Sequence, residues 1–108
     1  MAVDKQTALR KITVDVKVEQ VASTLTVTSF TTVSKEAVSY EKLMEQIIQL
    51  NSLEKNGYYS CSMNDSQYLV KYTQRLILYD ASSKNSAVQD VVGEGIIHLR
   101  AAMYSLLA

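Results

Sequence analysis

The chain has 108 residues, of which 47% are hydrophobic and 20% charged; this is the composition of one globular domain and excludes an intrinsically disordered chain. Eleven basic and eleven acidic residues balance to a net charge of zero, which argues against a dedicated duplex-DNA binder, because phosphate neutralisation supplies most of such a protein's affinity. No apolar run is long enough to cross a bilayer and no apolar signal segment opens the sequence. We therefore expect a single cytoplasmic domain over residues 1–108, with residues 1–8 loosely held and no membrane partner.

The first part of the chain predicts two antiparallel strands. Residues 11–19 alternate strictly, with Val16 and Val18 on one face and Lys17 and Glu19 on the other, as in a half-buried strand. Residues 24–33 are rich in Thr and Val and predict the returning strand, which leaves residues 20–23 as the turn.

Helical spacing replaces the alternation further along and predicts an amphipathic helix over residues 39–55. Its apolar positions are Tyr40, Leu43, Met44, Ile47, Ile48 and Leu50. Ser34 or Ser39 can cap the start by accepting a hydrogen bond from a free backbone N–H. Asn56 and Gly57 can end the helix, since both tolerate left-handed backbone.

A second strand pair is predicted at residues 58–63 and 67–79, joined by a turn at residues 64–66, where Asn, Asp and Ser favour turns. The later strand would run roughly 43 Å at about 3.3 Å per residue. This exceeds the usual length of a strand. Either a bulge interrupts it or it extends beyond its own sheet to meet a partner.

The last predicted helix covers residues 86–107, after a polar loop at 80–85, and Ser83 or Ser86 can cap it. Its core-facing residues are Val88, Val91, Val92, Ile96, Leu99, Met103 and Leu106. The elements together predict an α+β fold of ββαββα order, an antiparallel sheet with two helices packed on one face.

Asp90, Glu94 and His98 recur every four residues on one flank of this helix, a spacing at which carboxylates and an imidazole can share a metal ion. Cys61 and His98 are the sole Cys–His couple that the sequence offers for nucleophilic chemistry. We interpret these residues as a solvated helix flank and a small core side chain. No catalytic residue, metal site or cofactor is therefore predicted.

Another flank of the same helix carries Gly93, Ile97, Ala101 and Tyr104, away from the core stripe. A helix packed only on its own sheet is expected to be polar there. The sequence thus predicts a second neighbour for this flank. That neighbour is either the first helix or a symmetry-related copy, whose backbone the small residues would let approach.

Five of the seven tyrosines fall in the second strand pair, next to basic residues. Rings and cations on an exposed sheet can stack bases and hold phosphates, which makes Lys71, Tyr72, Arg75 and Tyr79 a candidate nucleic-acid site. Cross-strand packing of tyrosines explains the same bias.

From these patterns we expect a non-enzymatic, self-associating structural or binding subunit, a dimer or larger homo-oligomer, such as a virion subunit or another assembly component. A nucleic-acid-binding module using the strand at 67–79 is the alternative, and a small metal-dependent enzyme is the third hypothesis. The final strand, turn and helix are loosely similar to the end of small viral coat subunits. The helix at 39–55 does not suit that comparison, so no family is assigned.

Overall fold

The computed structural model describes residues 12–77 and 84–107 as four strands and two helices. In chain order these are β1 (Asp15–Val21), β2 (Thr24–Ser34), α2 (Tyr40–Leu53), β3 (Gly57–Met63), β4 (Gln67–Ile77) and α3 (Lys84–Leu107). The strands form one sheet in the order β1-β2-β4-β3, and every neighbouring pair is antiparallel. The predicted α+β class and ββαββα order are confirmed.

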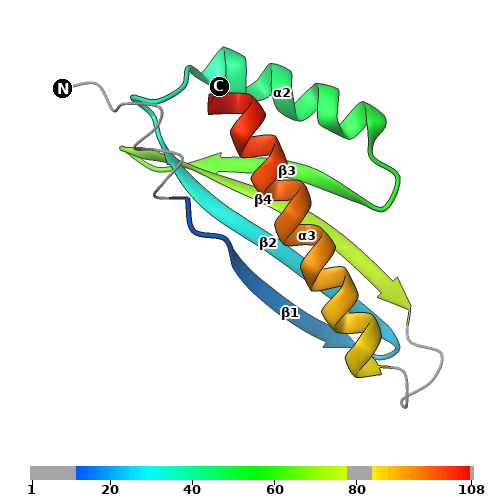
Figure 1. Ribbon diagram of the computed structural model, residues 1–108. Helices are drawn as coiled ribbons and strands as arrows, with labels where there is room; N and C mark the ends of the chain where they lie inside the picture. Colours follow the sequence, from blue (N-terminus) through cyan, green and yellow to red (C-terminus); the bar gives the residue numbers. More distant parts are fainter. Residues whose placement is uncertain (1–11, 78–83, 108) are drawn as a thin grey trace.

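Both helices lie on the same side of the sheet (Figure 1). α3 crosses in front of β2 and β4, while α2 runs along β3 and meets the C-terminal end of α3. Between them lies a core of apolar side chains from the helices and the inner face of the sheet. Its fully buried members include Leu25, Val27, Leu43, Val70, Tyr72, Leu99, Met103 and Leu106.

Short turns set the register of both strand pairs. Two residues connect β1 to β2, and the first of them, Ala22, adopts a positive φ of 54°, which fits the tight turns that two-residue hairpins require. Between β3 and β4 the side chain of Asn64 accepts hydrogen bonds from the backbone N–H groups of Ser66 and Gln67 at 2.9 and 2.8 Å. The turn predicted at residues 64–66 is confirmed.

Pairing with the equally long β2 explains the length of β4. All eleven of its residues pair with β2, from Gln67 opposite Ser34 to Ile77 opposite Thr24, without interruption. Neither a bulge nor an overhang is therefore needed within the described part of the strand; residues 78 and 79, which the sequence assigned to it, lie outside the described residues.

α2 begins as predicted at Ser39, whose hydroxyl accepts a hydrogen bond from the Lys42 N–H at 3.2 Å. The prediction for its end is wrong. The helix stops at Leu53 with Glu54 in extended backbone, and Gly57 has no positive φ. Gly57 instead opens β3, where a Cβ would collide with the backbone carbonyl of Thr73.

α3 packs on the sheet through Leu99, Met103 and Leu106, as predicted, while its valines and Ile96 are half-buried. The helix already includes residue 86, so Ser86 does not cap it, and Ser83 lies outside the described residues. Gly95 faces the sheet where a Cβ would come within 2.5 Å of Ser29 Oγ and 2.6 Å of Gln74 Oε1. The absence of a side chain here lets the helix approach the sheet closely.

Candidate interaction surfaces

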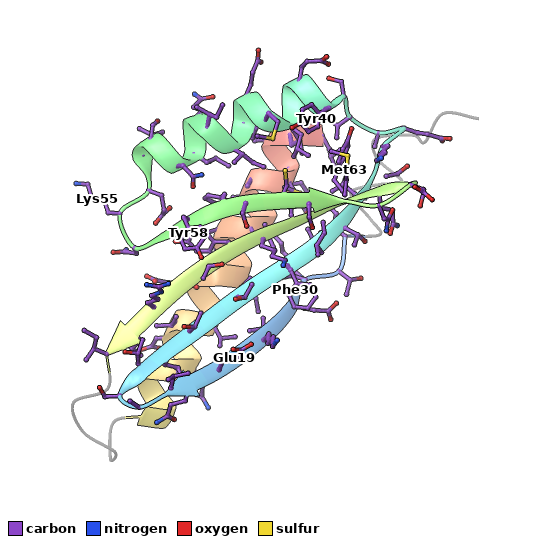
Figure 2. All side chains as sticks on the ribbon, turned by 180° about the vertical axis from the view of Figure 1, so that it is seen from behind. Glu19, Phe30, Tyr40, Lys55, Tyr58 and Met63 are labelled. Carbon is purple, nitrogen blue, oxygen red and sulfur yellow. The ribbon has the colours of Figure 1, made fainter. Side chains whose placement is uncertain are left out.

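The face of the sheet opposite the helices is open, and Figure 2 shows it with α3 lying behind the strands. Directly paired residues of neighbouring strands share a face of the sheet, so the register of the strands shows which side chains lie on this open side. They are mainly hydroxyl-bearing and basic side chains: Lys17, Thr26, Thr28, Ser60, Lys71, Thr73 and Arg75, with Phe30, Tyr58 and Leu69 among them. We call this set, together with Asp15 and Glu19 of β1, the open face.

A shallow hollow of about 510 Å³ occupies the middle of the open face. Phe30 and Leu69 form an apolar patch in it, Lys17 and Lys71 line it, and Tyr58 stands at its border with 48% of its surface exposed. A second hollow of about 310 Å³ shares Tyr58 with the first and adds basic side chains of Lys55 and Arg75. The open face thus offers an exposed ring flanked by cations.

Charge is distributed unevenly over the two sides of the molecule. Among the described acidic residues only Asp15 and Glu19 lie on the open face, and Glu19 is paired with Lys17 at 2.7 Å. Lys71 and Arg75 have no ion-pair partner among the described residues. Three basic residues against two acidic ones leave the open face with a small positive excess.

The structure separates the residues of the predicted nucleic-acid site. Lys71 and Arg75 lie on the open face, but Tyr72 points to the helices and is completely buried, so its inclusion was wrong. Strand alternation alone places residue 72 on the opposite face from residues 71 and 75, so the sequence itself distinguishes them. Tyr79 lies outside the described residues. Tyr58, which the prediction did not include, is the exposed tyrosine of the open face.

Tyr72 instead links three elements inside the domain. Its hydroxyl donates to Glu54 Oε1 at 2.8 Å and lies 3.3 Å from His98 Nδ1. Since the phenol proton is directed to Glu54, we assign the N–H of His98 as donor to the phenol oxygen. Tyr59 stacks on Tyr72 with ring centroids 4.6 Å apart, and the side chain of Asn51 binds both backbone groups of Tyr59. The end of α2, the sheet and α3 are thereby joined.

The environment of this network keeps both phenols protonated. Burial and the neighbouring Glu54 carboxylate raise the pKa of Tyr59 to about 12, and burial together with the hydrogen bond to Glu54 raises the pKa of Tyr72 further. Burial alone would raise the pKa of Glu54, but hydrogen bonds from Tyr72 and the backbone of Asn56 lower it overall. Both phenols therefore stay protonated and bound to their partners near neutral pH.

The other candidate reactive residues do not converge. Asp90 and Glu94 are exposed on α3, while the ring of His98 is engaged with Tyr72. Cys61 contacts Met44 through sulfur atoms 3.6 Å apart, and burial raises the pKa of its thiol. Within residues 12–77 and 84–107, no group of three His, Cys, Asp or Glu side chains is arranged to hold a metal ion.

The apolar flank of α3 is uncovered. Ile97 and Tyr104 are 67% and 56% exposed, Ala101 is exposed, and a Cβ at Gly93 would have no neighbour within 4 Å. Of the two neighbours that the sequence allowed, α2 does not cover this flank, although it contacts α3 elsewhere.

Comparison with known proteins gives no relative. No family model matches the chain, and neither a curated protein nor a solved structure is significantly similar to it. Among the described helices, none combines the length and apolar character needed to span a bilayer. Any functional conclusion therefore depends on the surfaces themselves.

Proposed function

We propose that this protein is a non-enzymatic subunit that associates with copies of itself. The observation that carries the proposal is the uncovered flank of α3, where Gly93, Ile97, Ala101 and Tyr104 present apolar surface to solvent. Gly93 and Ala101 are small, which allows a second backbone to approach closely. A net charge of zero removes long-range repulsion between copies.

The size of the expected effect follows from Ile97. Burying an isoleucine side chain completely is worth about 1.5–3 kcal/mol. With two-thirds of Ile97 exposed, covering it in both copies of a dimer contributes on the order of 2–4 kcal/mol. That corresponds to roughly a 30- to 1,000-fold change in dissociation constant.

Sedimentation equilibrium of the wild type and Ile97→Glu tests this proposal. We expect the wild type to sediment as a species heavier than the 12.0 kDa chain and Ile97→Glu to dissociate. Ile48→Glu is the matched control, because Ile48 is 65% exposed on α2 and lies outside the proposed surface. A wild type that remains monomeric at high concentration, or equal dissociation by both variants, would contradict the proposal.

A second candidate function is the binding of single-stranded nucleic acid by the open face. It is supported by the concentration of Lys55, Lys71 and Arg75 around Tyr58, an exposed ring, on a side with few carboxylates. Base stacking on an aromatic side chain contributes about 1–3 kcal/mol, and basic side chains follow the phosphates.

Fluorescence anisotropy with labelled oligo(U) and oligo(dT) tests this second function. The double variant Lys71→Ala/Arg75→Ala should weaken binding and reduce the slope of log K against log salt by about 1.4, at roughly 0.7 per phosphate contact on a single strand. Lys42→Ala removes an exposed cation from α2 and is the control. The absence of binding at low salt would eliminate this function.

A further inference from the structure

We propose that two copies of the chain join edge to edge through β1, so that their sheets merge into one continuous antiparallel sheet. The inference rests on the proposed self-association and identifies a surface for it. The partner is a second copy, in which β1 runs antiparallel to the first with the two Val18 residues opposite each other.

The two edges of the sheet differ in how their backbone groups are satisfied. At the β3 edge, the side chain of Asn51 accepts from the Tyr59 N–H at 2.6 Å and donates to the Tyr59 carbonyl at 2.9 Å. β1 forms the opposite edge, and it pairs with β2 along its whole length. Among the described residues no other strand pairs with β1. The outward N–H and C=O groups of Val18, at the middle of this edge, have no backbone partner among the described residues and can serve as a template for another strand.

The sequence of β1 is complementary to itself in this orientation. Lys17 and Glu19 flank Val18 symmetrically and lie on the same face, where they form an ion pair within one copy. Antiparallel pairing about Val18 sets Lys17 opposite the second copy's Glu19, and Glu19 opposite the second copy's Lys17. Opposite charges at directly paired positions stabilise a sheet, and like charges destabilise it.

The inner side of β1 also lacks cover. Val18 faces the helix-bearing side, opposite Val27, yet it is 44% exposed, whereas Val27 is completely buried. Figure 1 shows the reason: α3 lies over β2 and β4, and most of β1 lies beside it. A second β1 would place one Val18 against the other and cover part of both.

The exposed flank of α3 faces away from the sheet. His98 faces β4, where it contacts Tyr72. At about 100° per residue, Gly93 and Tyr104 lie roughly 140° and 120° around the helix from His98. Ile97 lies roughly 160° around the helix from Leu99, which is completely buried, so the centre of this flank points to solvent above the sheet and not toward β1. The proposed pairing therefore leaves this flank available for other contacts between copies, and sets the two open faces side by side.

Charge reversal at β1 tests the pairing. Lys17→Glu places a glutamate at both positions 17 and 19, and Glu19→Lys places a lysine at both, so each variant alone should dimerise about 10- to 100-fold more weakly than the wild type. An equimolar mixture should recover association as a mixed dimer, because the two glutamates of one variant then face the two lysines of the other. The ion pair within each copy is absent in both variants, so recovery can only come from contacts between copies.

With one variant uniformly labelled with 15N, native mass spectrometry distinguishes the mixed dimer from the two homodimers, and circular dichroism verifies that each variant is folded. If the wild type is dimeric while both variants remain so and the mixture shows no preference, the β1 interface is wrong and self-association stands. If the wild type is monomeric at high concentration, both proposals fail.

Cross-linking supplies a second measurement in the background Cys61→Ser, which removes the sole native cysteine. Oxidation of Val18→Cys should yield a disulfide-linked dimer, since directly opposed residues have Cα atoms about 4.5–5.5 Å apart. Val21→Cys is the control: Val21 is 74% exposed, but pairing about Val18 sets it opposite Asp15. Faster cross-linking through Val21→Cys would indicate random collision and overturn the register.

Discussion

The approach of α3 to the sheet at Gly95 gives a prediction about the stability of the domain. In Gly95→Ala the new Cβ would lie 2.5 Å from Ser29 Oγ and 2.6 Å from Gln74 Oε1, both on side chains that are almost completely buried. Ordinary contacts begin near 3.4 Å, so one or both atoms must move by nearly 1 Å in a packed interior. Gly93→Ala is the matched control, since its Cβ would meet nothing within 4 Å.

The two substitutions share the same gain in helix propensity, about 1 kcal/mol. Overpacking a core costs about 1–3 kcal/mol. Gly95→Ala should therefore be less stable than Gly93→Ala by about 1–3 kcal/mol, or several degrees to about 20 °C in Tm for a domain of this size.

Urea denaturation of both variants at equal protein concentration measures this difference. Ser29→Ala adds a further test, because the Ser29 hydroxyl is buried without a hydrogen-bond partner and its removal opens space for the new Cβ. The double variant Ser29→Ala/Gly95→Ala should recover part of the loss. Equal stabilisation by Gly95→Ala and Gly93→Ala would refute the close approach of α3.

Three further predictions concern the turn and the buried network. Ala22→Gly should raise the free energy of unfolding by up to about 1 kcal/mol, because glycine adopts positive φ without steric cost; a lower Tm would contradict the turn geometry. Tyr72→Phe should lower it by about 1–3 kcal/mol, since Glu54 and His98 both lose a partner; unchanged stability would show that the network is not structural. Folding lowers the pKa of Glu54 below its ordinary value of 4.5, so the ionised carboxylate stabilises the fold at pH values above 4.5. This stabilisation is lost as pH falls through the folded pKa. Tm should therefore fall less steeply below pH 4.5 in Glu54→Gln than in the wild type or in the exposed control Glu45→Gln.

Local patterns predicted most of the fold because each element carried its own signal. Alternation predicted the first strand, although β1 covers Asp15–Val21 instead of residues 11–19; helical spacing predicted α2 and α3, and the Asn64 turn fixed the second hairpin. The incorrect predictions concern residues whose role depends on tertiary contacts. The backbone freedom of Gly57 predicts a helix end, but the absence of a Cβ at this position instead avoids a collision with the carbonyl of Thr73, which only the paired strand reveals.

The candidate surfaces were predictable in part. Period-four spacing located the flank of Gly93 and Ile97, whereas only the packed structure shows that α2 leaves it uncovered. The open face required the register of the sheet, since Tyr58 and Lys71 come from different strands. The self-complementarity of Lys17 and Glu19 is visible in the sequence, but its significance depends on β1 being an edge strand.

Sedimentation equilibrium of the wild-type chain tests the central claim most directly. Self-association predicts that the weight-average mass rises with concentration toward at least twice the 12.0 kDa of one chain. It also predicts that Ile97→Glu delays this rise and that Ile48→Glu does not. A mass that stays at 12.0 kDa at every concentration would contradict self-association.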